Sequence, residues 1–351
     1  MDFFVVNGKI WQGEGRFCES MILRGGRIAA TGAAAVLEPD SEGCALLDCG
    51  GRTVIPGIVD PYGALPQPPP QKGLTDWLEG QLHQLARAGI TGVQWPDWDG
   101  NLAKSILPVL GQLAGKTPLP RLQLLTRKNR GWESGFGGRL TTVEELPQLT
   151  HQGGQLVVDI ADGGELEGFL QQLRFRPLPA GNPRRLTLVG ADCTGPEQLQ
   201  KLGQLGIGIV GFPTRLEACL LRCAAQPGVQ TDTCCAWRTL SHLGAKVAFA
   251  GTDRAAPFAG LQKAVCRCTV SLSGASHPSR EAVTVEAGLT AMTAGAAWMT
   301  FQEDFIGQLL PGYRADLLVL SDDPFACPPD RLGLLHPVLT MVGGRVSWRE
   351  I

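Results

Sequence analysis

The chain has 351 residues, enough for two domains or for one barrel-sized domain with an appendage. Hydrophobic residues make up 44% and charged residues 18% of it, ordinary proportions that exclude a disordered, collagen-like or coiled-coil chain. Its 31 basic and 33 acidic residues give a formal net charge of −2. Proteins that bind nucleic acid or an acidic membrane need an excess of positive charge, so this balance argues against both as partners.

The N-terminal residues and the cysteines indicate a soluble, cytoplasmic protein. The sequence starts MDFFVVNGKIW, without the basic and apolar stretches of a signal peptide, and no run reaches the roughly 18 apolar residues of a membrane span. The 11 cysteines are an odd number and form no C-x-x-C or C-x-x-H pair. Cys219 and Cys223, four residues apart, fall on one face of a predicted helix. We therefore expect free thiols in a reducing compartment.

Short strands and hairpin turns are predicted at both ends of the chain. FFVVNGKIW carries an Asn-Gly turn at Asn7, and VLTMVGGRVSW near the C-terminus carries a Gly-Gly turn at Gly343. Neither segment is large enough to close a core alone, so we expect the two to pair in one small β-sandwich domain. We place this composite domain at residues 1–54 and 306–351, with residues 55–305 between its halves.

The central residues alternate between short apolar runs and longer helical patterns, as in repeated βαβ units. Strands are predicted at residues 54–60, 92–97, 121–126, 155–160, 185–190, 207–212 and 246–253, and helices at 74–89, 101–115, 142–153, 165–175, 195–206 and 284–300. About 250 residues of such alternation is the usual length of a TIM-like (β/α) barrel. The stretch 120–155 holds one predicted strand where a full barrel needs two, so the pattern leaves seven or eight strands open.

Four motifs in order resemble the amidohydrolase superfamily. VIPGIVDPYGAL (54–65) is similar to its first barrel strand, and RLTLVGADCTGPEQLQKLGQLGIGIVGFPT (185–214) to a later strand-helix-strand unit. AKVAFAGTDRAAPF (245–258) resembles the G-S-D-x-P strand of the metal-dependent hydrolases. The segment 293–325 resembles their return to the β domain through G-x-x-A-D-L-V-V-L. The resemblance implies a barrel with a composite β domain and a hydrolase of amide or cyclic amide C–N bonds.

The resemblance also implies a divalent metal held by histidines at the strand ends, and those histidines are missing. Tyr62 and Ala64 stand where the superfamily has H-x-H, and Asp159 and Gly190 stand where later strands carry histidine. The chain's five histidines are His83, His151, His242, His277 and His336. They fall on predicted helices or loops, and no two of them are spaced as H-x-H. We therefore predict no metal site and no cofactor, with a divalent metal only if the site has been rebuilt.

Several other residues are candidates for a site at the barrel mouth. Asp253 is the one ligand-set position that keeps the superfamily's residue, and we take it as the candidate catalytic residue. Tyr62, Asp159, Asp192 and Cys193 follow strand ends and are candidates for substrate binding. The simpler interpretation is that such carboxylates cap the next helix, as Asp60 and Asp192 are placed to do, and that Cys193 is an inert thiol.

Two functions remain open from the sequence. The first is an amidohydrolase-like protein that has lost its catalytic metal site and has a structural or regulatory role. The second is a hydrolase of C–N bonds with a rebuilt site around Asp253, Asp159 and Tyr62. Both predict a small-molecule ligand at the mouth, no nucleic acid or membrane partner, and leave room for a homo-oligomer or a protein partner.

Overall fold

The structure is a computed structural model of the whole chain. It describes residues 1–69, 73–113, 118–127, 136–146, 155–160, 163–175, 177–178, 181–225, 233–270 and 276–350.

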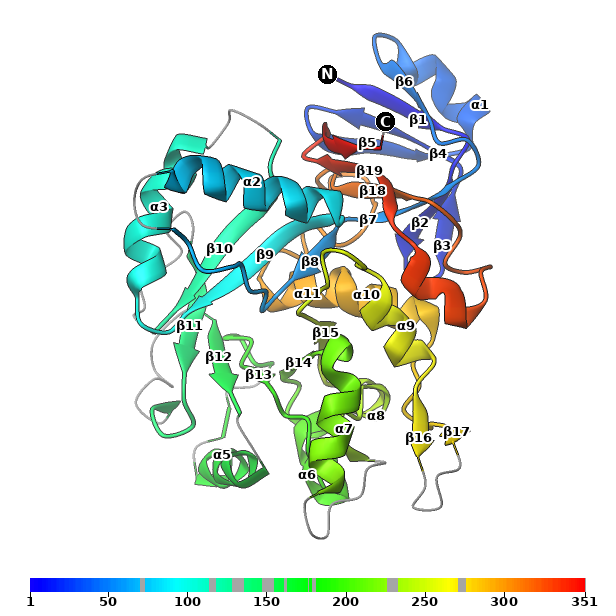
Figure 1. Cartoon of the computed structure of the whole chain (residues 1–351). Helices are drawn as coiled ribbons and strands as arrows, with labels where there is room; N and C mark the ends of the chain where they lie inside the picture. The colour runs from blue at the N-terminus through cyan, green and yellow to red at the C-terminus, as the bar shows by residue number, and fades with distance from the viewer. Residues whose placement is uncertain are drawn as a thin grey trace.

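Eight parallel strands form the central sheet and curve into a nearly closed barrel (Figure 1). In spatial order they run consecutively: β8 (Ile58–Asp60), β9 (Ile90–Asp97), β10 (Arg121–Thr126), β11 (Phe136–Thr141), β12 (Leu156–Asp159), β13 (Thr187–Val189), β14 (Gly208–Gly211) and β15 (Lys246–Phe249). Inward-facing side chains from these strands, including Val59, Leu125, Val157, Val189 and Val210, form one buried cluster. The barrel interior is therefore a packed core.

The structure answers the open question of strand number. β11 lies within residues 120–155, where only one strand was predicted, and pairs in parallel with β10 and β12. Its sequence, FGGRLT, has two glycines after the first residue and lacks the long apolar run that would have identified it. Lys128, the lysine closest to this region, and His151 lie outside the described residues.

The predicted strand at 54–60 is in fact two strands. β7 (Thr53–Pro56) belongs to a terminal sheet and β8 begins the barrel, with Gly57 between them. A Cβ at Gly57 would collide with the side chain of Thr91, which explains the glycine at this crossing.

Helices cover the outside of the barrel (Figure 1). They are α2 (Leu74–Arg87), α3 (Asn101–Leu113), α5 (Gly163–Phe175), α6 (Pro196–Gln204), α7 (Leu216–Ala224), α8 (Trp237–His242), α9 (Ala259–Val265), α10 (Val285–Met292) and α11 (Ala294–Met299). Two 3₁₀ turns are η2 (Pro213–Arg215) and η4 (Pro329–Leu334). A separate hairpin consists of β16 (Cys268–Val270) and β17 (Ser276–Pro278). Within the described residues, no helix combines the length and apolarity needed to cross a membrane.

The two ends of the chain meet in the terminal sheets. One sheet has the order β5-β4-β1-β6, and the other has the order β20-β19-β18-β7-β2-β3. Their strands are β1 (Phe3–Val6), β2 (Lys9–Gly13), β3 (Arg16–Cys18), β4 (Ser20–Arg24), β5 (Arg27–Gly32), β6 (Ala45–Asp48), β18 (Leu317–Leu320), β19 (Pro337–Val342) and β20 (Arg345–Arg349), and α1 (Ala34–Leu37) with η1 (Glu38–Ser41) precedes β6.

Pairing of β18 with β7 joins the C-terminal segment to the N-terminal one, and both chain ends lie in this part of the molecule (Figure 1). The predicted fold class, a TIM-like barrel with a small β domain built from both termini, is confirmed. The exact boundaries at residues 54 and 306 stay a prediction.

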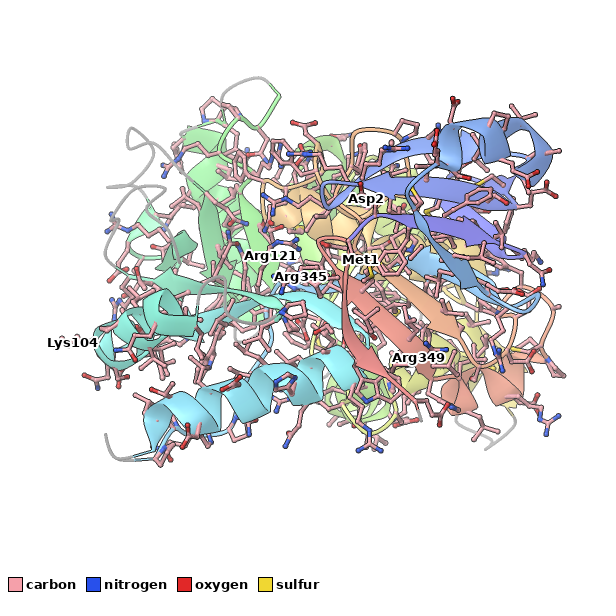
Figure 2. The ribbon with its side chains drawn as sticks, turned by 90° about the horizontal axis from the view of Figure 1, so that it is seen from above. Met1, Asp2, Lys104, Arg121, Arg345 and Arg349 are labelled. Atoms are coloured by element: carbon pink, nitrogen blue, oxygen red, sulfur yellow. A yellow bond between two sulfur atoms is a disulfide. The ribbon has the colours of Figure 1, made fainter. Side chains whose placement is uncertain are left out.

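An ion pair joins the barrel to the terminal sheets. The Arg121 guanidinium, at the start of β10, forms two hydrogen bonds with the carboxylate of Asp316, which is buried just before β18. Asp316 also accepts a hydrogen bond from the backbone N–H of Gly343 at 2.7 Å. Figure 2, seen from above, labels Arg121 where the barrel strands meet the terminal sheets. A bidentate pair of this kind fixes orientation as well as distance.

Candidate ligand site at the barrel mouth

A cavity of about 320 Å³ opens at the carboxyl ends of the barrel strands. It is lined by Tyr62, Asp159, Ile160, Val189, Gly190, Asp192, Phe212, Arg215, Ala218, Cys219 and Arg222. These residues come from the ends of β8, β12, β13 and β14 and from α7, which meet because parallel barrel strands all end at one face. A larger cavity of about 660 Å³ lies between α8, α10 and the outer face of β15, away from the strand ends.

Tyr62 and Asp159 form a hydrogen bond across this cavity. The Tyr62 hydroxyl donates to Oδ2 of Asp159 at 2.9 Å and accepts from Nε1 of Trp98 at 3.3 Å. Burial, reinforced by the negative charge of Asp159, raises the pKa of Tyr62, so the phenol stays protonated. Burial also raises the pKa of Asp159, although the hydrogen bond from Tyr62 opposes this rise. The structure thus places two predicted site residues together.

Further charged groups line the same cavity. Burial raises the pKa of Asp192, and the Arg222 guanidinium, 3.6 Å from its carboxylate, opposes that shift. Arg215 is exposed at the rim and packs over the ring of Phe212 at 4.8 Å. Sequence reasoning missed both arginines because neither lies at a strand end: Arg215 is in the turn η2 and Arg222 is on helix α7. The mouth therefore offers two carboxylates, two guanidinium groups and a phenol.

Five cysteines gather behind Asp192, namely Cys193, Cys219, Cys223, Cys234 and Cys235, and for two of them the expectation of free thiols is wrong. Cys193 and Cys223 form a disulfide, so Cys193 is neither a nucleophile nor an inert thiol. Sγ of Cys219 lies 3.9 Å from that of Cys223 and 2.8 Å from that of Cys235. The sequence hides this cluster because it brings together the exit of β13, one face of α7 and the loop before α8.

Asp253 is placed outside the cavity lining. Its side chain is exposed, and Oδ1 accepts the backbone N–H groups of Ala255 at 2.8 Å and Ala256 at 3.4 Å. Arg254 turns away to Gln81 and the carbonyl of Ala64. The described contacts of Asp253 are those of a turn cap.

Asp60 has a structural role that sequence reasoning did not assign. This carboxylate, 3% exposed at the end of β8, accepts the backbone N–H groups of Gly251 at 3.2 Å and Thr252 at 3.0 Å, just past β15. It also accepts the N–H of Tyr62 at 3.2 Å. Asp60 therefore joins the first and last barrel strands, between which no strand pairing is formed in the described residues, and does not cap a helix. Burial raises its pKa despite these hydrogen bonds.

The chain belongs to the amidohydrolase family: the family model described as "Amidohydrolase family" matches residues 140–347, more than half of its length. A protein of Bacillus subtilis (strain 168), named "Putative amidohydrolase YtcJ", is 33% identical over 123 residues. This stretch is 34% of the chain and spans only 23% of that relative.

Solved structures agree on the fold. An uncharacterized metal-dependent hydrolase from Pyrococcus furiosus has a TM-score of 0.71 at 13% identity, covering 93% of this chain and 100% of its own. The 5-methylcytosine deaminase from Klebsiella pneumoniae has a TM-score of 0.70 at 17% identity, covering 99% of this chain and 98% of its own. At these identities the likeness establishes the architecture alone.

The residues at the positions where the resemblance implies metal ligands do not fit a metal centre built from histidines. Tyr62 and Asp159 are hydrogen-bonded to each other, and Ala64 has no side-chain donor atom. Gly190 has a φ of +79°, and a Cβ there would lie 2.6 Å from the carbonyl oxygen of Ile160. A histidine at this position would require the backbone to move.

The histidines lie elsewhere. His83 is on α2, His242 is on α8 and His336 precedes β19, and none of them lines the mouth cavity. His151 and the side chain of His277 lie outside the described residues.

Proposed function

We propose that this amidohydrolase-family protein has lost the family's histidine metal centre and binds a small charged organic molecule at the barrel mouth without hydrolysing it. The observation that carries the proposal is the hydrogen bond between Tyr62 and Asp159, which joins two strand ends that hold metal ligands in the family. Tyr62 and Asp159 are thus hydrogen-bonded to each other, and neither is an imidazole.

The chemistry of the mouth favours a zwitterionic ligand. Among the described residues, the guanidinium of Arg215 forms no hydrogen bond or ion pair and lies only over the ring of Phe212, so it is available for a carboxylate. Asp159 receives Tyr62 on Oδ2, which leaves Oδ1 for an amino group. A volume of about 320 Å³ suits a molecule of amino-acid size. We infer a ligand that carries one carboxylate and one amine or amide.

Calorimetric titration with amino acids, their N-carbamoyl derivatives and cyclic amides tests this function. We expect binding of at least one of these classes with no hydrolysis of it by the same protein. Arg215→Ala and Asp159→Asn should each weaken binding by about 10-fold or more, the effect of losing one charged hydrogen bond. Arg174→Ala, on the exposed face of α5, is the matched control and should bind normally. Absence of binding, or turnover of the bound molecule, would overturn the proposal.

A hydrolase with a rebuilt site is the second candidate function. Asp159 and Asp192 line one cavity and burial raises the pKa of both, which suits general acid–base catalysis. Asp253 lies outside that cavity, so such a site would use Asp159 with Tyr62. Release of amine or carboxylate from a panel of amides and cyclic amides, abolished by Asp159→Asn, would favour this function over the first.

A further inference from the structure

Asp192, Cys219 and Cys235 place one oxygen and two sulfur atoms together on the wall of the mouth. These three atoms lie within 4.8 Å of one another. Both cysteines are buried, at 4% residue exposure for Cys219 and 1% for Cys235. We propose that these three side chains bind a zinc ion through two thiolates and one carboxylate.

The donor set matches zinc chemistry. Zinc takes thiolate sulfur at about 2.3 Å and carboxylate oxygen at about 2.0 to 2.2 Å, so two of its ligands are at most about 4.6 Å apart. Sγ of Cys219 and Sγ of Cys235, now 2.8 Å apart, must separate to bind the ion from two sides. Two thiolates and a carboxylate around a divalent ion leave one negative charge, which the guanidinium of Arg222 near Asp192 offsets.

The site has an open side. Asp192 and Cys219 both line the cavity at the mouth, whereas Cys235 lies behind them. Three protein ligands leave one position of a tetrahedral zinc ion, and that position faces the cavity. Solvent or a bound ligand fills it.

The disulfide holds two of the three ligands in place. Cys193 is the neighbour of Asp192 in sequence, and Cys223 lies one helical turn after Cys219 on α7. The bond between Cys193 and Cys223 therefore ties the exit of β13 to α7 and keeps Asp192 near Cys219. It also withdraws Cys223 from the ligand set, although its sulfur lies 3.9 Å from that of Cys219.

The backbone holds the third ligand. Cys235 has a φ of +47°, a conformation that residues other than glycine seldom adopt. Its N–H donates to the carbonyl of Asp192 at 2.6 Å, and its own carbonyl accepts from Nη1 of Arg267 at 2.6 Å. Arg267 is itself only 4% exposed. The surrounding structure thus maintains an unfavourable backbone conformation that directs Cys235 toward Asp192 and Cys219.

A second disulfide between Cys219 and Cys235 is the competing interpretation of the short sulfur contact. A disulfide would not interact with the carboxylate of Asp192 beside it, whereas a zinc ion would bind that carboxylate as its third ligand. The zinc site is also separate from the family's metal positions, because Tyr62, Asp159 and Asp253 take no part in it. Its existence therefore does not depend on the ligand proposed for the mouth.

The test is zinc binding by the full-length protein with its Cys193–Cys223 disulfide intact. Elemental analysis after dialysis against zinc should give about one ion per chain, and Co²⁺ in its place should give a sulfur-to-cobalt charge-transfer absorption band. Cys219→Ser, Cys235→Ser and Asp192→Asn should each weaken zinc binding, by about 100-fold or more for the cysteines. Cys234→Ser, at the neighbouring buried position, is the matched control and should retain the ion.

Three results would overturn the zinc site. One is failure of the unmodified protein to bind zinc or to give the cobalt band while its thiols react freely. Another is a Cys219–Cys235 disulfide found by peptide mass spectrometry under the purification conditions. The third is loss of the ion in Cys234→Ser with retention in Cys235→Ser. Hydrolysis by the zinc-loaded protein would contradict the proposed function and leave the zinc site standing.

Discussion

The hydroxyl of Tyr62 donates a hydrogen bond to the carboxylate of Asp159, joining the end of β8 to the end of β12 across the barrel mouth. Both side chains are partly buried, and Trp98 donates to the same hydroxyl. In this chain a neutral phenol donor, Tyr62, and a carboxylate acceptor, Asp159, thus stand at positions where the family resemblance implies metal ligands.

Tyr62→Phe should lower the free energy of unfolding by about 1 kcal/mol, the usual contribution of such a hydrogen bond. It should also raise the pKa of Asp159 further, because the hydrogen bond from Tyr62 is what opposes the effect of burial. Denaturant unfolding and NMR titration of the carboxylate measure the two effects. Tyr313→Phe, at the chain's other tyrosine, is the control. A Tyr62→Phe protein as stable as the parent would show that the contact contributes nothing.

The raised pKa of Asp159 predicts the direction of a pH dependence. The folded state holds the proton more tightly than the unfolded chain, whose carboxyl titrates near the ordinary value of 3.8. The stabilising contribution of this group is complete below that pH and is lost as pH rises through the folded-state pKa. As pH rises above about 3.8, Asp159→Asn should therefore lose less stability than the parent does. A steeper fall in the variant would show that the pKa is lowered instead.

Asp60→Ala should destabilise the fold by about 2 to 4 kcal/mol, because three backbone N–H groups lose a buried acceptor. The N–H groups of Gly251 and Thr252 should then exchange with deuterium much faster than before, since the carboxylate joins their segment to β8. Asp253→Ala is the matched control and should change stability by only about 0.5 kcal/mol, because this side chain is exposed. Equal effects of the two variants would contradict the role given to Asp60.

Loss of the Cys193–Cys223 disulfide should cost about 2 to 4 kcal/mol, since it closes a loop with a sequence separation of 30 residues. The double variant Cys193→Ala/Cys223→Ala should melt at a lower temperature, and reductant should lower the melting temperature of the parent but not of the variant. Cys327→Ala, at a free cysteine outside the cluster, controls for cysteine replacement. If reductant leaves the melting temperature of the parent unchanged, and the parent has two more reactive thiols than the double variant, the bond does not form.

The sequence predicted the barrel because most strands are short runs rich in apolar residues, such as RLQLLT at 121–126, which β10 matches in full. It missed β11 because FGGRLT has glycines in place of such a run. Tyr62 and Asp159 could be proposed from the family's strand ends, whereas Arg215 and Arg222 could not, since they follow a turn and lie on a helix.

The cysteine cluster and the role of Asp60 depend on contacts between distant segments. Cys193 and Cys223 are 30 residues apart, and nothing in their spacing selects one partner among 11 cysteines. Asp60 reaches residues about 190 positions later, so its place at a strand end looked the same as that of a helix cap. Asp253 kept the family's residue type while its described contacts are those of a surface turn.

Anomalous X-ray diffraction at the zinc edge, from crystals soaked in Zn²⁺, shows whether the mouth still binds a metal at the strand ends of β8 and β12. We expect no anomalous peak beside Tyr62 and Asp159, whose hydrogen bond of 2.9 Å should persist in the soaked crystal. A peak at Asp192 and the cysteines would concern the separate zinc site and leave this expectation untouched. A zinc ion about 2.0 to 2.2 Å from the Asp159 carboxylate, with the Tyr62 hydroxyl displaced from it, would contradict the claim that the family's metal centre has been lost.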